Sequence, residues 1–197
     1  MARGEITQDE RHLLARLDRA FAHQRNLDPA VLASVRAWQK TDRTYELVQL
    51  FLRGQLTGLL DATQLSEIHT VRQDLDLAVR SGCLPFPLRV FRGLRDVEVS
   101  LGFAPDRMPG RRIDLSGFCA TTVFRRVALD DFTARRGVLL DFVLPRGTPA
   151  LWVAGVGDSD LRWQGELLLG FGTKLDVYSH VRSIGSIPIL LGKGVAP

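Results

Sequence analysis

The hydrophobic period of the chain changes near residue 82, and this change limits the possible folds more than any other feature. Before it, apolar residues recur every three or four positions, as they do on one face of an α-helix. After Pro85 and Pro87, short β-branched or aromatic runs stand between Gly and Pro residues, which is typical of strands joined by turns. Helices followed by strands, without a regular alternation of the two, indicate an α+β fold.

Four helices are expected before the change. The second is the best defined, because Asp28 can cap its N-terminus and Pro29 suits the first helical position. The expected helices cover 8–25, 29–38, 45–54 and 65–79. The expected strands cover 88–94, 117–123, 137–144, 150–153, 165–169, 175–181 and 187–191, with a short helix over 129–135. Because a length of 197 residues suits one domain, 1–197, we expect the helical part, 1–82, to pack on the β-rich core, 83–197.

The composition excludes several classes of protein. With 45% hydrophobic and 24% charged residues, the chain is not a disordered tail, and its longest apolar runs are too short to span a bilayer. Residues 1–5 lead directly into charged helical sequence, so we expect no signal peptide and no membrane partner. Neither Cys83 nor Cys119 stands at ligand spacing from a histidine, so we expect no metal site.

Arginine supplies 23 of the 26 basic residues, and the net charge is +4. The first 80 residues hold 11 basic and 11 acidic residues, whereas the remainder holds 15 basic and 11 acidic residues. Arginine grips phosphates through bidentate hydrogen bonds, but a base-composition bias in the genome would also replace lysine by arginine. Because arginines also crowd the neutral part, we interpret most of them as compositional background.

The first informative segment is the expected strand 88–94. Alternation on this strand places Arg92 on the same face as Val90 and Leu94. If that face looks inward, the guanidinium needs an anionic partner. The alternative is that Arg92 is simply an exposed strand residue.

Two later segments add polar residues that suit a ligand site. The expected strand 117–123 carries Thr121 and Thr122, whose small hydroxyl side chains would let a ligand approach, although threonine also favours strands in general. Gln164 and Glu166 stand two residues apart at the start of an apolar strand, so we expect them to point to the same side. A carboxylate there is either an active-site group or a residue that keeps the sheet edge soluble.

In their order along the chain, these three segments resemble the Arg, Ser-Thr-Ser and Gln/Glu-x-Glu motifs of the mono-ADP-ribosyltransferase toxins. The likeness is strongest to the clostridial Rho-modifying exoenzymes and the enzymatic components of binary actin-modifying toxins, and it extends over about residues 42–180. It implies the ADP-ribosyltransferase fold, with a helical bundle packed on a mixed, mainly antiparallel core of two sheets. It also implies NAD as the co-substrate, without a metal.

The resemblance implies which residues hold NAD. Arg92 matches the arginine that holds the phosphate and ribose, and Gly93 would let its backbone approach the nicotinamide carboxamide. Phe132 matches the aromatic residue that stacks on nicotinamide, with a core anchor for the short helix as the alternative. Arg135 or Arg136 matches the second phosphate-binding arginine. The excess charge after residue 80 therefore suggests a small phosphate ligand more than a nucleic-acid surface.

The resemblance also implies the reacting groups. Glu166 matches the catalytic glutamate, which hydrogen-bonds the 2′-hydroxyl of the nicotinamide ribose and stabilises the positive charge that develops as nicotinamide leaves. Gln164 matches the first position of the Gln-x-Glu form. In the family, Gln there accompanies Asn or Gln acceptors, or guanine in DNA-modifying relatives, whereas Glu accompanies arginine acceptors. We therefore expect an Asn or Gln acceptor rather than arginine.

Two departures from the family pattern stand beside these matches. The first Ser of Ser-Thr-Ser is Ala120, so the hydroxyl that usually helps orient the catalytic Glu is missing unless Thr121 or Thr122 replaces it. The aromatic residue usually found three positions before the Gln or Glu is Leu161, while Trp163 directly precedes the motif. Trp163 is either the aromatic residue that contacts the substrate or a cover for the sheet edge.

Our main functional hypothesis is an NAD-dependent mono-ADP-ribosyltransferase that releases nicotinamide and modifies a protein acceptor of unknown identity. The alternatives are an NAD glycohydrolase and a degenerate member that binds a nucleotide or partner without turnover, with a guanine-modifying DNA enzyme as a minor one. We expect cytoplasmic action or delivery as a toxin or effector into a target-cell cytosol. The hypothesis leaves room for a neutralising partner protein and does not call for a nucleic-acid partner.

Overall fold

Four α-helices occupy the part of the chain that the sequence predicts to be helical. The computed structural model describes residues 6–40, 44–56, 60–95, 104–115, 117–134, 137–182 and 187–195. The first part consists of α1 (Gln8–Ala20), the 3-10 turn η1 (Ala22–Asn26), α2 (Pro29–Gln39), α3 (Thr44–Leu52) and α4 (Ala62–Arg80). The first helix is shorter than predicted, because the chain leaves α-helical geometry at Phe21 and continues as η1.

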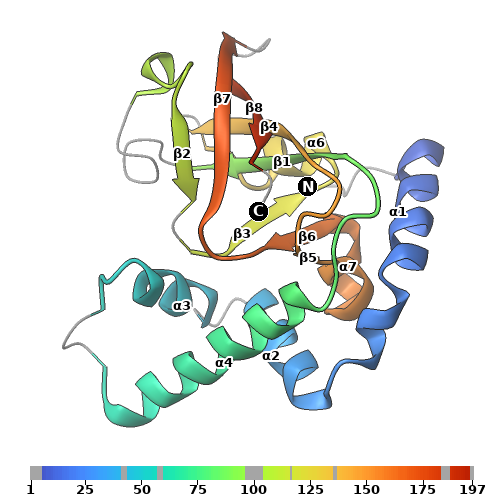
Figure 1. The fold of residues 1–197 in the computed structure, drawn as a ribbon, viewed down its shortest axis with the longest axis vertical. Coiled ribbons are helices and arrows are strands. Elements are labelled where there is room, and N and C mark those ends of the chain that lie inside the picture. The colour runs from blue at the N-terminus through green and yellow to red at the C-terminus, as the bar shows by residue number, and fades with distance from the viewer. Residues whose placement is uncertain are drawn as a thin grey trace.

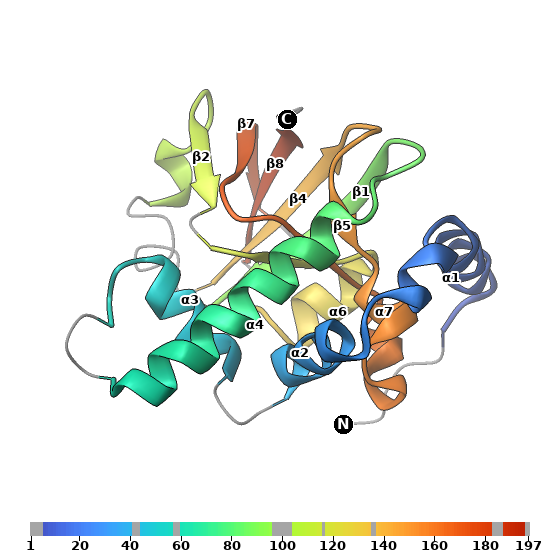
Figure 2. The same ribbon diagram turned by 60° about the horizontal axis from the view of Figure 1, so that its bottom comes forward.

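Side-chain caps define where the helices begin. Thr7 accepts a hydrogen bond from the backbone of Glu10, whose carboxylate accepts one from the backbone of Thr7 in return. Asp61 and Gln64 form the same capping box at α4, and Asp28 caps α2. The caps fix the N-terminal ends of α2 and α4, two helices that pack against each other (Figure 2).

The strands form a mixed, mainly antiparallel sheet, as predicted. Its members are β1 (Leu88–Leu94), β2 (Arg112–Leu115), β3 (Cys119–Thr122), β4 (Val138–Leu144), β5 (Ala150–Leu151), β6 (Glu166–Leu169), β7 (Thr173–Arg182) and β8 (Pro188–Gly194). The spatial order is β2-β7-β8-β4-β1-β3-β6-β5, and among these described strands β4 and β8 are the one parallel pair. Shorter elements connect the strands: η2 (Pro105–Arg107), α6 (Arg125–Asp130), α7 (Val153–Val156) and η3 (Ser159–Gln164).

The expected division into two sheets is not confirmed, because hydrogen bonds join the eight described strands into one sheet. The junction in the middle is narrow. β1 pairs with β4 along its whole length, whereas it meets β3 in one register pair, Phe91 opposite Thr122. The group β3, β5 and β6 therefore joins the other strands over a short contact and lies next to the helices in Figure 1.

Three local predictions are wrong. The edge strand β2 is absent from the prediction, because four residues with two charges give a weak pattern. The short helix α6 begins four residues earlier than predicted, since Val127 and Ala128 are the residues that turn into the core. The strand expected at 150–153 ends at Leu151 and α7 follows, because a buried apolar run does not distinguish a strand from a helix.

Two clusters of buried hydrophobic residues join helices to strands. In one cluster, Leu17 and Phe21 at the end of α1 lie with Val90 and Phe142 of the sheet. The other cluster places α2 and α4 against β5 and β6. The helical part and the strands therefore share their core (Figure 1). None of the described helices combines the length and the apolar character needed to cross a bilayer.

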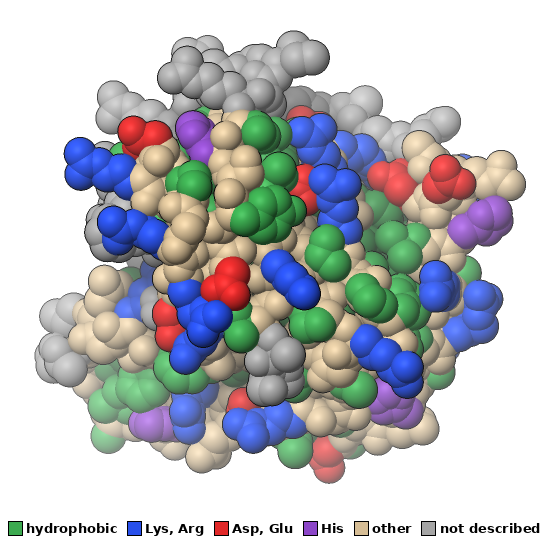
Figure 3. All heavy atoms as spheres, turned by 45° about the horizontal axis from the view of Figure 1, so that its top comes forward, with side chains coloured by type: hydrophobic (Ala, Val, Ile, Leu, Met, Phe, Trp, Pro, Cys, Tyr) green, Lys and Arg blue, Asp and Glu red, His purple; other side chains and the backbone are tan. Residues whose placement is uncertain are grey.

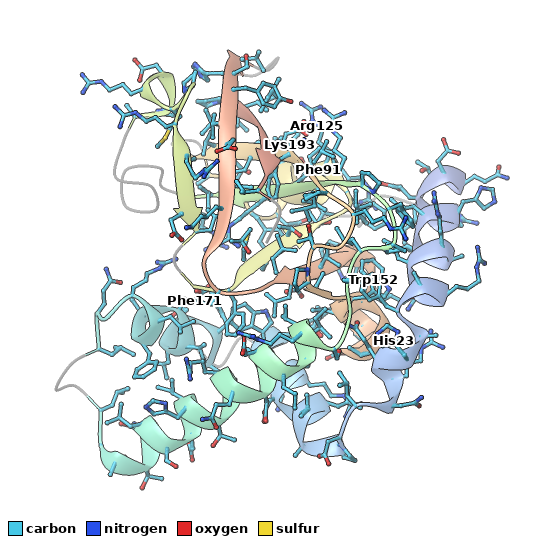
Figure 4. All side chains as sticks on the ribbon, viewed as in Figure 1. His23, Phe91, Arg125, Trp152, Phe171 and Lys193 are labelled. Atoms are coloured by element: carbon cyan, nitrogen blue, oxygen red, sulfur yellow. The ribbon has the colours of Figure 1, made fainter. Side chains whose placement is uncertain are left out.

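We predict that Asp18→Ala lowers the free energy of unfolding by about 1–3 kcal/mol, because it leaves a buried donor without a partner. Trp152, labelled in Figure 4, is 1% exposed, and its Nε1–H donates to Asp18 Oδ1 at 2.9 Å. Arg162 pairs with the other oxygen of Asp18. Urea denaturation measures the loss. The control is Asp76→Ala, which removes the exposed pair with Arg80 and should cost about 0.5 kcal/mol or less; equal losses in both variants would contradict the prediction.

Candidate functional site

A cavity of about 500 Å³ lies between the helical part and the sheet, where β1 meets β3. Elements from distant parts of the sequence line it: α2, α3, β1, β3, η3 and β6. Seven residues singled out from the sequence are among its lining: Arg92, Gly93, Thr121, Thr122, Phe132, Gln164 and Glu166. Trp163 is not among the lining residues, and Arg135 and Arg136 lie outside the described residues.

Two side chains at the C-terminal end of α2 hold the carboxylate of Glu166. The Nε1–H of Trp38 donates to Oε1 at 3.1 Å, and the Nε2–H of Gln39 donates to Oε2 at 3.0 Å. Glu166 itself is 9% exposed, and the three leucines that follow it in β6 are fully buried. Each carboxylate oxygen therefore has a fixed neutral donor, on a strand that is anchored in the core.

Burial raises the pKa of Glu166, because desolvation disfavours the charged carboxylate. The hydrogen bonds from Gln39 and Trp38 and the positive charge of Arg92 act in the opposite direction without cancelling the effect. A glutamate with a perturbed pKa in a cavity is a candidate functional group.

Arg92 extends from β1 across the narrow junction to β3. Its Nη1–H donates to the carbonyl oxygen of Ala120 at 2.7 Å, and its side chain lines the cavity from the strand face that also carries the buried residues Val90 and Leu94. Arg53, at the end of α3, has its pKa lowered by burial and by the charge of Arg92. The guanidinium of Arg92, which lines the cavity, favours an anionic ligand there.

The hydroxyl groups of β3 do not contact the carboxylate of Glu166. Thr121 donates its hydroxyl proton to the carbonyl oxygen of Leu167 at 2.7 Å, and Thr122 donates to the carbonyl oxygen of Gln164 at 2.5 Å. A hydroxyl group has one proton to donate. In this structure neither threonine therefore donates to the carboxylate in place of the hydroxyl that Ala120 lacks.

Gln164 and Glu166 reach the cavity in a different way from the one predicted. They do not alternate along a strand, because Gln164 ends η3 and Gly165, with a φ of 55°, turns the chain before β6 begins. Both nevertheless line the cavity. Trp163 packs against the cluster of hydrophobic residues that contains Phe124 and is not among the residues that line the cavity.

Gly93 and Phe132 meet at the edge of the cavity. A Cβ added at Gly93 would come 2.5 Å from the carbonyl oxygen of Ala128 and 2.5 Å from Oγ1 of Thr133. Close packing against α6 and the segment after it thus requires glycine, whatever the cavity binds. The side chain of Phe132 is 37% exposed and lines the cavity, so it does not anchor the short helix in the core.

Reasoning from the sequence missed the contribution of the helical part. Trp38, Gln39 and Tyr45 line the cavity, and the first two bind Glu166 from 128 and 127 residues away in the sequence. The available signal was weak: a helix was predicted up to Trp38, but nothing in its pattern indicates which strand it faces. Within the described ranges, no group of three His, Cys, Asp or Glu side chains is placed to hold a metal ion.

The arrangement combines a desolvated carboxylate, a guanidinium and an exposed aromatic ring around one cavity. The guanidinium of Arg92 suits a phosphate, and the ring of Phe132 offers a face for stacking. The carboxylate of Glu166 can accept a hydrogen bond from a hydroxyl group and can stabilise positive charge that develops nearby. Together these groups suit a phosphate-bearing ligand from which a positively charged centre forms.

Comparison with known proteins identifies solved structures that share the fold of this chain. No protein-family model matches the sequence, and the search of curated proteins finds no match. Among solved structures, Plx2a, an ADP-ribosyltransferase toxin from Paenibacillus larvae, matches with a TM-score of 0.73 at 16% identity, over 95% of this chain and 97% of that one. C3stau2 from S. aureus, in a structure with NAD, matches with a TM-score of 0.74 at 18% identity, over 94% and 96%.

BECa, the ADP-ribosylating toxin of a C. perfringens binary enterotoxin, solved with NADH, matches with a TM-score of 0.76 at 14% identity. The match covers 94% of this chain and 48% of BECa. At these identities the likeness shows the fold: the chain has the α+β fold of the ADP-ribosyltransferase toxins, as the sequence predicts.

Proposed function

We propose that the chain is a member of the ADP-ribosyltransferase toxins and acts as an NAD-dependent mono-ADP-ribosyltransferase. The observation that carries the proposal is the cavity in which Glu166 and Arg92 lie together with Gly93, Thr121 and Phe132. These residues match the family pattern in the sequence, and the fold brings them to one place. The NAD-bound and NADH-bound states of C3stau2 and BECa support the choice of ligand.

The proposed reaction breaks the bond between the nicotinamide nitrogen and C1′ of the ribose, and forms a bond between C1′ and an acceptor nitrogen, which loses a proton. Arg92 binds the phosphate through its guanidinium, with the charge of Arg53 nearby. Phe132 stacks on the nicotinamide ring. Glu166 accepts a hydrogen bond from the ribose 2′-hydroxyl and stabilises the positive charge that develops at C1′.

We further propose an Asn or Gln side chain of a protein as the acceptor. Gln164 lines the same cavity as Glu166, and its amide can pair with an amide acceptor. On the face shown in Figure 3, the Lys and Arg side chains lie scattered among apolar and acidic ones, so this face does not suit a nucleic-acid acceptor. No broad basic stripe for a phosphate backbone is visible on that face of the described residues.

Incubation with NAD labelled in its adenylate part and a cell lysate tests the proposal. Label that enters protein and survives nuclease treatment supports a protein transferase. Free ADP-ribose without labelled macromolecules supports an NAD glycohydrolase, and label removed by nuclease supports a nucleic-acid acceptor. Intact NAD after prolonged incubation with excess protein leaves only a non-catalytic role and refutes the proposal.

The raised pKa of Glu166 predicts how turnover depends on pH. Protonation neutralises the carboxylate, so activity should fall as the pH drops through the raised pKa. The acid limb of the profile of kcat is therefore expected above the pH at which a solvated glutamate titrates. Nicotinamide release measured in a series of buffers of equal ionic strength checks this; an acid limb at the ordinary glutamate pKa or below contradicts it.

A further inference from the structure

The strand beside Glu166 supplies no hydrogen bond to its carboxylate. Ala120 has no polar side-chain atom, and Thr121 and Thr122 donate their hydroxyl protons to backbone carbonyl oxygens. The register places Thr122 opposite Glu166 and Ala120 opposite Leu168, so Ala120 is the diagonal neighbour of Glu166 on the same face. A buried carboxylate in this position needs donors from another element.

Those donors come from α2, and their own positions are fixed. The indole of Trp38 is 5% exposed and packs edge-on against Phe118, with ring centroids 5.8 Å apart at 76°. The Oε1 of Gln39 accepts a hydrogen bond from the backbone N–H of Asp158 at 2.7 Å, which leaves its Nε2–H directed at Glu166. Each donor is thus held on one side by packing or a hydrogen bond and meets a different carboxylate oxygen on the other.

We infer that Trp38 and Gln39 are positioning residues that orient Glu166 for its reaction, a task that β3 does not perform in this chain. The inference rests on the proposed function. It assigns to the C-terminal end of α2 a direct part in the geometry of the site, although neither side chain needs to touch the reacting atoms.

The chemistry favours neutral donors in these two places. A carboxylate that stabilises developing positive charge must keep both its own charge and its direction. An arginine paired with it would neutralise that charge, whereas an indole and an amide hold the oxygens and leave the charge in place. Their hydrogen bonds also lower the pKa of Glu166 against the effect of burial. Loss of either donor should therefore misdirect the carboxylate and raise its pKa further.

Kinetics of Trp38→Phe and Gln39→Met test the inference, since each variant keeps most of the side-chain volume and removes the donor. We expect kcat for nicotinamide release to fall about tenfold to a hundredfold in each variant. The KM for NAD should change by less than about threefold, because the groups that hold NAD are untouched. The matched control is Trp152→Phe, which removes an indole hydrogen bond to Asp18; neither residue lines the cavity, so kcat should stay unchanged.

Two further measurements separate positioning from general damage to the fold. The acid limb of kcat should move to higher pH in Trp38→Phe and Gln39→Met but not in Trp152→Phe. Adding Ala120→Ser to Gln39→Met should recover part of the lost kcat, because a hydroxyl on the diagonal position can replace the missing donor. Unchanged kcat and an unchanged acid limb in both α2 variants would overturn the inference.

If the wild-type protein turns over no NAD, the proposed function fails, and titration of Glu166 then decides the inference. Carbon-13 NMR of glutamate-labelled protein follows the carboxyl group directly, with Glu166→Gln to assign its resonance. A pKa that rises in Trp38→Phe and Gln39→Met, but not in Trp152→Phe, supports orientation of the carboxylate by α2. A pKa equal to that of the wild type in both variants overturns it.

Discussion

Glu166→Gln is expected to lower kcat for nicotinamide release by about 10²–10³-fold, the loss typical of removing one preorganised electrostatic group. The substitution preserves the size of the side chain and removes the charge that would stabilise the developing positive centre. It also brings two donors face to face, because Trp38 and Gln39 each donate to one carboxylate oxygen and an amide offers only one oxygen. Reorientation of the amide therefore cannot restore the original contacts.

Nicotinamide release by the pure protein measures the effect, and calorimetric titration with NAD shows whether binding persists. We expect the Kd for NAD to change by less than about tenfold, because Arg92 and Phe132 remain in place. Glu67→Gln on the exposed face of α4 is the control with the same chemical change, and it should behave as the wild type. Equal turnover by Glu166→Gln and the wild type would remove Glu166 from the mechanism.

The features of the site that could be predicted from the sequence are those that depend on local periodicity. Alternation on β1 places Arg92 on the same face as Val90 and Leu94, which are buried in the core, because residues two apart in a strand point to the same side; Arg92 lines the cavity from that face. The change from helical to strand period likewise identifies the α+β fold, since the period reports which residues face a core. In both cases the information lies within a few neighbouring residues.

The hydrogen bonds that α2 donates to Glu166 could not be predicted from the sequence. They depend on how α2 packs against a strand more than a hundred residues later. Trp38 reads in the sequence as the last apolar residue of an amphipathic helix, and Gln39 as a polar residue at its end. The packing of the cluster around Val35 and Leu168 brings the end of α2 beside β6. No local sequence pattern indicates that α2 and β6 lie side by side. The two donors can therefore be identified only in the folded structure.

The wrong geometry predicted for Gln164 has a local cause. Two residues two apart share a face only if the intervening residue is extended. Gly165 instead adopts a φ of 55°, in the left-handed region. A glycine at this position in the sequence was the signal that the strand begins after it. The late start of β6 also explains the position of Trp163. This residue belongs to η3 and packs against the core instead of lying on a strand face.

Arg92→Met is expected to raise the Kd for NAD by about 10²-fold, since a hydrogen bond to a charged group contributes about 1.5–3 kcal/mol. A second consequence concerns the pKa of Glu166. Burial raises this pKa, and the charge of Arg92 partly opposes the rise. Without that charge the pKa should rise further, so the acid limb of kcat should move to higher pH at saturating NAD. Burial would still lower the pKa of Arg53, but the smaller contribution from the charge of Arg92 would be lost.

The control is Arg89→Met on the same strand, because the guanidinium of Arg89 pairs with Asp141 at 2.7 and 2.8 Å, away from the cavity. Arg92→Lys separates charge from shape: a lysine keeps the positive charge but cannot make the bidentate contact. If the guanidinium binds phosphate, Arg92→Lys should weaken NAD binding while its acid limb stays close to that of the wild type. If Arg92 only ties β1 to β3 through Ala120, both Arg92 variants should lose unfolding free energy while the folded protein retains its Kd for NAD.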